Sequence, residues 1–288
     1  MKVLRFIFSL RFAAILVGLS ALLLLSTRLF SFSLSEDSIS SSFGELEYSP
    51  EHHYYQYQGE RMHYVTCGDS SAIPLLMVHG SPGSWDNFVK FVTEAEVLNK
   101  FFIIAVDRPG YGDSQNKELR SLSQQSKALK QIIENHFHDE EGYLLGHSYG
   151  GAVCLQLATD YSEQFKGMLL AAGTLADIYQ KPRWYNYAVR YTPVGWLLNE
   201  TFKLSNREMW RLPEDLQSLY PDLSKLDMKI AMLQGGRDFL VDPATPDYLF
   251  SQLPNGQTRV FYWEDMDHFL IWNDLDKIES ALAWLTEV

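Results

Sequence analysis

Residues 146–151 read Gly-His-Ser-Tyr-Gly-Gly and place one serine, Ser148, between glycines that leave room for a tight turn. The apolar run Tyr143 to Leu145 comes directly before this motif, and a helix-compatible apolar stretch, Ala152 to Ala158, follows it. A strand, a sharp turn and a helix in this order form a nucleophile elbow, and the helix directs its free N–H groups and positive dipole end toward the serine. The pattern therefore predicts that Ser148 is a nucleophile.

A serine hydroxyl becomes a good nucleophile only when a base removes its proton and a third group orients that base. In the chain order serine, acid, histidine, the acid ends a late strand and the histidine follows the last strand. Asp238 lies just past an apolar run and a pair of glycines, and Asp242 is a competing acid four residues further on. Of the eight histidines, His268 alone follows the last predicted strand. We therefore expect a catalytic triad of Ser148, Asp238 and His268.

Acyl transfer also needs hydrogen-bond donors for the oxyanion that develops in the transition state. The loop His79 to Ser84 follows a predicted strand that ends at Val78, where a tight loop can direct a backbone N–H toward the nucleophile. We expect the backbone N–H groups of Ser81 and Tyr149 to form the oxyanion hole. For His79, packing within the loop is favoured over a catalytic role.

The elements that must position these residues are visible as continuous apolar runs, which are typical of strands buried on both faces. The runs are Pro74 to Val78, Phe101 to Val106, Tyr143 to Leu145, Met168 to Ala172, Ile230 to Leu233 and Val260 to Trp263. Helix-compatible stretches, such as Ser123 to Phe137 and Leu275 to Leu285, separate most of them, and a hairpin is predicted around Gly59. This alternation predicts an α/β fold with a mainly parallel sheet flanked by helices.

The interval between Gly173 and Lys229 breaks the alternation, because about 55 residues pass without a clear strand. A structureless connection of that length is improbable in a compact domain, so residues 174–228 predict a small helical cap inserted over the site. The segment is rich in aromatic residues, which either shape the site or pack the cap onto the main domain: Trp184, Tyr185, Tyr187, Tyr191, Trp196 and Trp210.

The amino terminus holds an uncharged run of sixteen residues, Phe12 to Thr27. At 1.5 Å per residue the run reaches ~24 Å, short of a ~30 Å hydrocarbon core unless Arg11 and Arg28 snorkel at its ends. No convincing cleavage site follows, so residues 1–30 predict an uncleaved signal-anchor, with a cleaved signal peptide as the alternative. Because three basic residues precede the run and one follows it, we expect a membrane-anchored protein with its catalytic domain on the exported (periplasmic or extracytoplasmic) side.

Composition limits the remaining possibilities. The 288-residue chain has a formal net charge of -12, and such an anionic body repels phosphate backbones, so no nucleic-acid partner is expected. The sequence contains neither a Gly-rich phosphate loop nor a His-Glu-x-x-His motif, and no cofactor or metal is expected. Residues 31–50, with eight serines, predict a flexible linker before a domain that spans residues 51–288. The oligomeric state stays open.

Taken together, these motifs resemble the α/β-hydrolase superfamily from about Tyr54 to Val288. The segments that carry the resemblance are His79 to Ser84, Asp107 to Ser114, Gly146 to Gly151, Asp238 and His268. The chain looks most like the capped branch that contains epoxide hydrolases, haloalkane dehalogenases, proline iminopeptidase-like peptidases and small esterases. The resemblance implies an eight-stranded, mostly parallel sheet, a lid after the sixth strand and no cofactor.

The chain departs from parts of that branch at decisive positions. Epoxide hydrolases and dehalogenases use an aspartate where this chain has Ser148, so epoxide and halide chemistry is disfavoured. Iminopeptidase-like proteins usually carry a second glycine where Ser81 stands, and the cap shows no clear acidic pair for a free amine. We therefore expect a serine hydrolase, a carboxylesterase that cleaves a small-molecule ester or related acyl bond through an acyl-enzyme intermediate. The alternatives are an iminopeptidase-like peptidase, a C–C bond hydrolase on the same triad, and a non-catalytic binding scaffold.

Overall fold

The computed structural model describes residue 18 and residues 33–115, 119–137, 141–254 and 257–287. The predicted signal-anchor, residues 1–30, lies outside these residues apart from Gly18. Within the described part of the chain, no helix is both long enough and apolar enough to cross a membrane.

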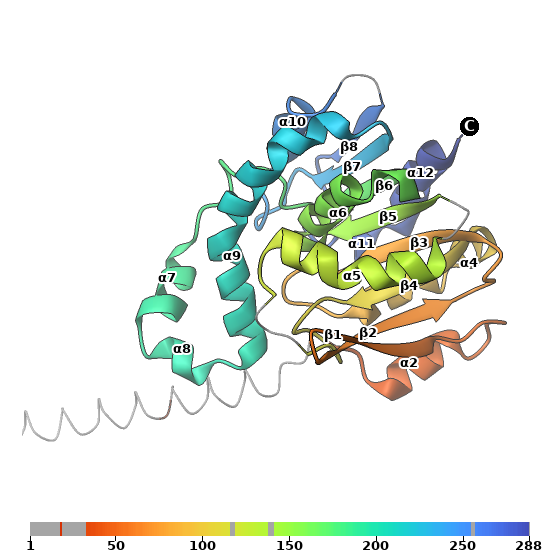
Figure 1. The fold of residues 1–288 in the computed structure, drawn as a ribbon, viewed down its shortest axis with the longest axis horizontal. Helices are drawn as coiled ribbons and strands as arrows, with labels where there is room; N and C mark the ends of the chain where they lie inside the picture. Colours follow the sequence, from red (N-terminus) through yellow and green to blue (C-terminus); the bar gives the residue numbers. More distant parts are fainter. Residues whose placement is uncertain (1–17, 19–32, 116–118, 138–140, 255–256, 288) are drawn as a thin grey trace, which may run out of the picture.

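The described residues form one eight-stranded sheet with the strand order β1-β2-β4-β3-β5-β6-β7-β8 (Figure 1). The strand pairs β1–β2 and β2–β4 are antiparallel, whereas the pairs from β4–β3 through to β7–β8 are parallel. The strands are β1 (Glu51–Tyr57), β2 (Glu60–Cys67), β3 (Ile73–Val78), β4 (Phe101–Asp107), β5 (Gly142–His147), β6 (Phe165–Ala171), β7 (Lys229–Gly235) and β8 (Thr258–Trp263). The predicted α/β fold with a mostly parallel sheet is confirmed.

Helices cover both faces of the sheet, which explains why the central strands are apolar throughout rather than alternating. On β3, Leu76 and Val78 belong to one buried core, while Leu75 and Met77 belong to the core on the opposite face. The first core is covered by α5 (Leu122–His136), α6 (Tyr149–Asp160) and α10 (Thr245–Phe250). The second core is covered by η1 (Trp85–Phe88), α3 (Val89–Val92), α4 (Ala95–Lys100), α11 (Leu270–Asn273) and α12 (Leu275–Thr286). A short turn of 3₁₀ helix, η2 (Ser162–Gln164), precedes β6.

The segment predicted as a flexible linker, residues 31–50, contains a helix, α2 (Glu36–Phe43). Ser35 caps its amino end by accepting a hydrogen bond from the backbone N–H of Ser38. Ile39 and Phe43 lie four residues apart on one helix face and are buried in the second core. The linker prediction was therefore wrong for this stretch, because two apolar residues among serines give too short a pattern to reveal a helical period.

Between β6 and β7 the chain leaves the sheet and forms a helical layer at its side (Figure 1). The layer consists of α7 (Trp184–Tyr191), α8 (Val194–Leu197), α9 (Glu200–Leu219) and η3 (Tyr220–Lys225), all within the segment assigned from the sequence to a cap. The second half of α9 packs on the main domain, since Leu212, Leu216 and Leu219 are buried in the first core. Trp184, Tyr191 and Trp196 are 80%, 67% and 82% exposed, so these aromatics do not pack the cap onto the main domain.

Candidate active site

Ser148 lies at the sharp turn between β5 and α6. Its backbone has φ 53° and ψ -122°, a conformation that is strained for a residue with a side chain. The surrounding strands hold this turn, because the N–H of Ser148 donates to the carbonyl of Ala171 at 2.9 Å. The carbonyl of Ser148 accepts from the N–H of Thr174 at 3.1 Å. Such an over-determined, strained turn is the backbone geometry of a nucleophile elbow.

Glycines permit the close approaches around this turn. A Cβ added to Gly146 would lie 2.6 Å from the carbonyl oxygen of Gly150, and a Cβ added to Gly150 would overlap the carbonyl oxygen of Val78. On the facing loop, a Cβ added to Gly80 would lie 3.0 Å from the Cβ of Ser148. The glycines on either side of Ser148 thus leave the room for a tight turn that the sequence predicts, and the loop after β3 packs directly against Ser148.

Asp238 lies beside the imidazole of His268, with 2.9 Å between its Oδ2 and the Nδ1 of the ring. Its Oδ1 accepts from the backbone N–H groups of Leu240 and Val241, at 2.8 Å each. Burial alone would raise the pKa of Asp238. The hydrogen bond and charge of His268, together with the two backbone N–H groups, outweigh burial, so the net effect is a lowered pKa. The ionised carboxylate requires a hydrogen on Nδ1 and leaves Nε2 of His268 as an acceptor.

The competing acid, Asp242, does not contact His268. Its side chain is exposed and accepts from the backbone N–H of Ala244 at 3.0 Å, in the turn that precedes α10. A residue that was not singled out from the sequence, Gln234, donates its side-chain N–H to Oδ2 of Asp238 at 3.2 Å. The structure thus brings Asp238, rather than Asp242, together with His268.

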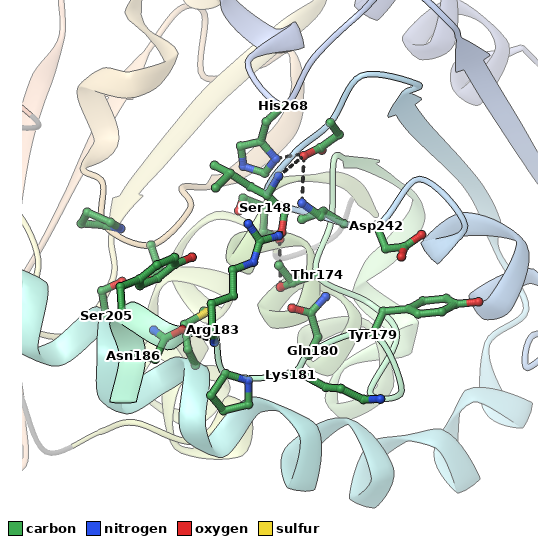
Figure 2. A pocket seen from close by; sticks show the side chains of 18 of the residues that line it. Ser148, Thr174, Tyr179, Gln180, Lys181, Arg183, Asn186, Ser205, Asp242 and His268 are labelled. Carbon is green, nitrogen blue, oxygen red and sulfur yellow. Dashed lines mark hydrogen bonds and ion pairs between the residues drawn. The ribbon is translucent and has the colours of Figure 1, made fainter. Parts of the chain in front are cut away.

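Ser148 and His268 line two adjoining cavities of about 550 and 400 Å³. The residues common to both are Ser81, Pro82, Ser148, Leu240 and His268. Figure 2 shows that the larger cavity extends under the cap, where its polar wall comes from Gln180, Lys181, Arg183, Asn186 and Ser205. The smaller cavity is mainly apolar, with Phe269 and Trp272 in its wall. Ser148 therefore stands where two chemically different cavities meet.

The predicted oxyanion donors both belong to segments that surround Ser148. Tyr149 is the first residue of α6, and N–H groups in the first turn of a helix have no intrahelical acceptor. Ser81 lies in the loop after β3 and lines both cavities. In the same loop His79 is fully buried, donates from Nδ1 to the carbonyl of Gly80 at 2.7 Å and accepts at Nε2 from the N–H of Arg108 at 3.0 Å. These contacts support the packing role expected of His79.

A buried ion pair links this loop to the cap. Nη1 of Arg108 lies 2.7 Å from Oε1 of Glu208 on α9, and neither side chain is exposed. The other oxygen of Glu208 accepts from the hydroxyls of Tyr111 and Ser81, at 2.6 Å each, and Gln125 donates to Oε1 at 2.9 Å. Glu208 therefore fixes the cap to the loop that holds Ser81. The sequence does not reveal this pair, because Arg108 and Glu208 are 100 residues apart and share no local pattern.

We predict that Glu208→Ala lowers the free energy of unfolding by about 3–5 kcal/mol, because it leaves the guanidinium of Arg108 buried without a counter-charge. Urea denaturation followed by circular dichroism measures this change. Glu214→Ala, at an exposed position on the same helix, is the control and should change stability by less than about 0.5 kcal/mol. Equal stabilities for the two variants would contradict a structural role for the ion pair.

Two buried histidines near the site are held neutral. His147 is buried, and its Nε2 donates a hydrogen bond to the backbone carbonyl of His268 at 3.1 Å. Burial, followed by the nearby charge of His268, lowers the pKa of His147 to about 3. Burial and then Arg108 lower the pKa of His79 well below its ordinary value. Both groups therefore bind a proton more readily in the unfolded chain than in the folded one.

This difference predicts acid sensitivity with a defined sign. Since the folded pKa of His147 is below its unfolded value of 6.5, its contribution to stability is present above pH 6.5 and is lost as the pH falls toward 3. Between pH 7 and pH 5 the native protein should lose about 2 kcal/mol more unfolding free energy than His147→Gln. Urea denaturation of both proteins at the two pH values tests this, and parallel losses would show that His147 is protonated in the folded state.

Among the described residues, no group of three or more His, Cys, Asp or Glu side chains is arranged to hold a metal ion. Cys67 and Cys154 are both free and buried, as small apolar side chains would be. Burial raises the pKa of each thiol, to about 11 for Cys67, so neither supplies a thiolate nucleophile at neutral pH.

The fold and this site define a class of protein, and comparison with known families agrees. Residues 73–197 match the family model described as the alpha/beta hydrolase fold. Together with the eight-stranded sheet, the sharp turn at Ser148 and the helical layer after β6, the match shows that the chain has the α/β-hydrolase fold.

Among curated proteins, the chain is 33% identical over 111 residues to the soluble epoxide hydrolase of Corynebacterium sp. (strain C12). The matched stretch covers 38% of this chain and 37% of that protein. It is 27% identical over 123 residues to the proline iminopeptidase of Thermoplasma volcanium, or 42% and 41% of the two chains. It is 29% identical over 115 residues to lipase 1 of Psychrobacter immobilis, or 39% and 35%. The chain thus matches about two fifths of the length of these relatives.

Among solved structures, a membrane phospholipase A described as a bacterial virulence factor superposes with a TM-score of 0.67 at 18% identity, and the match covers 100% of both chains. An esterase from Rhodococcus sp. ECU1013 superposes with a TM-score of 0.59 at 18% identity over 82% of this chain and 99% of that one. At these identities the likeness is one of fold.

Proposed function

We propose that the protein is a serine hydrolase that cleaves a carboxylic ester or a related acyl bond through an acyl-enzyme intermediate. The observation that carries the proposal is the grouping of three side chains. Ser148 stands at a strained turn on the floor of two cavities, His268 lines the same cavities, and Asp238 accepts a hydrogen bond from His268. This arrangement supplies the nucleophile, the base and the orienting acid that acyl transfer requires.

In this mechanism Oγ of Ser148 attacks the substrate carbonyl carbon while Nε2 of His268 takes its proton. Asp238 holds the ring in the required tautomer and stabilises the imidazolium that forms. The backbone N–H groups of Ser81 and Tyr149 donate to the oxyanion. His268 then returns the proton to the leaving alcohol, and a water molecule, activated in the same way, releases the acid and restores Ser148.

The two cavities suit the two ends of an ester. The smaller cavity offers Leu240, Phe269 and Trp272 to an apolar acyl group. The larger cavity offers side chains such as Lys181 and Arg183 to a polar leaving group. We infer an ester with an apolar acyl chain and a polar alcohol.

The contacts of Glu208 disfavour an aminopeptidase. It is a buried cap carboxylate near Ser81, but its oxygens already accept from Arg108, Tyr111, Gln125 and Ser81. A carboxylate engaged in this way has no lone pair left for the amino terminus of a peptide. Ester hydrolysis is therefore favoured over the iminopeptidase alternative.

Labelling with a fluorophosphonate probe, followed by a substrate panel, tests the proposal. The protein should label covalently and should hydrolyse p-nitrophenyl esters with a preference that depends on acyl length. Proline and other aminoacyl anilides should be cleaved far more slowly. Faster turnover of the anilides would assign the site to a peptidase, and absence of labelling together with absence of turnover would leave a binding scaffold.

We further propose that residues 1–30 anchor the protein in a membrane with the hydrolase domain on the exported side, supported by the apolar run Phe12 to Thr27 and its flanking charges. The full chain should pellet with membranes and resist carbonate extraction. A chain that begins at Ser33 keeps α2 and should be soluble and equally active on a small ester. Amino-terminal sequencing provides the opposing outcome, because a mature protein that begins between Ser26 and Ser42 would mean a cleaved signal peptide.

A further inference from the structure

The cap contains a cavity of about 450 Å³ that is separate from the two at Ser148. It lies among α7, α8 and α9, and no residue that lines it lines either catalytic cavity. Its walls include Arg120, Arg190, Trp196, Lys203, Arg207 and Trp210. The proposed ester hydrolysis gives this cavity no role.

The lining of this cap cavity is strongly basic. Arg120, Arg190, Lys203 and Arg207 line it, and the described lining residues include no Asp or Glu, although the whole chain has a net charge of -12. The carboxylate of Glu200 lies 3.0 Å from Lys203 and 4.0 Å from Arg207 and is half exposed. An exposed pair of this kind is weak, so the cavity keeps an excess of positive charge.

Two buried N–H donors in the cavity lining have no acceptor among the residues that the structure describes. They are Nε of Arg207 and Nε1 of Trp210. Buried donors are normally paired, and an unpaired one is unfavourable. Beside them, the guanidinium of Arg190 lies 4.6 Å from the ring centre of Trp210 and 5.5 Å from that of Tyr191. In the described part of the chain, the residues that line the cavity therefore combine two unpaired donors with positive charge, and none of them is an Asp or Glu.

A ligand with several acceptor oxygens and a negative charge matches these groups. Guanidinium groups bind phosphate-type oxyanions in a planar, paired geometry, and an indole N–H adds one further donor. We propose that the cap cavity is a second ligand site, which binds a phosphate-type oxyanion through Arg207 and Trp210. Trp196, 82% exposed, adds an apolar surface at the cavity. A phosphate that carries an apolar chain should therefore bind more tightly than free phosphate.

Isothermal titration of the full chain tests this proposal, in a Ser148→Ala background so that no ligand is hydrolysed. The two probes are inorganic phosphate and dihexanoyl phosphatidylglycerol below its micelle concentration. Saturable binding is expected, and Arg207→Gln should weaken it about tenfold or more, the effect of losing a hydrogen bond to a charged group. Trp210→Phe keeps the ring, removes the donor, and should weaken binding several-fold.

The matched control is Arg211→Gln, on the same helix, with the same loss of charge but outside the cavity, where Arg211 pairs with Asp215. It should leave binding unchanged. Tighter binding of the phospholipid identifies a lipid headgroup as the source of the oxyanion, and equal affinities identify free phosphate. The proposal is overturned if neither probe binds saturably, or if Arg207→Gln and Arg211→Gln weaken binding equally. Because binding is measured without turnover, either result is independent of the proposed hydrolase activity.

Discussion

Replacement of Ser148 by alanine is expected to abolish fluorophosphonate labelling and to lower kcat for a p-nitrophenyl ester by about 10⁶-fold. The attacking atom is lost, and neither His268 nor Asp238 can replace it. The fold should be unaffected, because the side chain of Ser148 opens on the cavities and its turn is held by backbone hydrogen bonds to Ala171 and Thr174. Intact-mass spectrometry after labelling and steady-state kinetics measure the two effects.

Ser205→Ala is the matched control, since Ser205 on α9 also lines the larger cavity but has no base beside it in the proposed mechanism. It should label and turn over nearly as the native protein does. Full activity in the Ser148→Ala variant would remove the mechanism altogether, whereas labelling that moves to another serine would show that the elbow had been assigned to the wrong chemistry.

Asp238→Asn should lower kcat by about 10⁴-fold. An amide at this position cannot accept from His268 and from the N–H groups of Leu240 and Val241 at the same time, because one of its two ends is a donor. The imidazole would then adopt the wrong tautomer or a displaced orientation. Kinetics on the same ester, with circular dichroism as the check on folding, measure the loss.

Asp242→Asn provides the comparison for this second prediction. Its carboxylate is exposed and accepts the N–H of Ala244 in the turn before α10, so the variant should keep activity within a few-fold of the native protein. A larger loss at Asp242 than at Asp238 would move the role of the acid to Asp242 and would require a different orientation of His268.

The sheet could be predicted because each of its central strands is a local, continuous apolar run. The run Phe101 to Val106 lies within β4, and Ile230 to Leu233 lies within β7. The geometry of the elbow was predictable for the same reason, since the glycines around Ser148 are local in sequence and each prevents a specific clash. Local patterns of this kind do not depend on how distant parts of the chain meet.

Features that depend on distant contacts could not be predicted. Helix α2 is stabilised by Ile39 and Phe43 packing on the second core, and two apolar residues in a serine-rich segment do not indicate that surface. The partnership of Arg108 with Glu208 exists only because α9 folds back onto the segment that follows β4. The pairing of Asp238 with His268 could be predicted from the sequence, because the order of the strands places both residues at the carboxyl ends of neighbouring strands.

The buried pair of Arg108 and Glu208 also constrains how such a protein can be recombined. A hybrid that took the segment between β6 and β7 from another hydrolase would separate the two residues, since Arg108 belongs to the body and Glu208 to the insert. Unless the donor segment carried a carboxylate at the same place, the hybrid would enclose an unbalanced guanidinium next to Ser81. Most folded chimeras should therefore be those in which residues 108 and 208 come from the same parent. When the substrate range is redesigned, the two positions should be exchanged together.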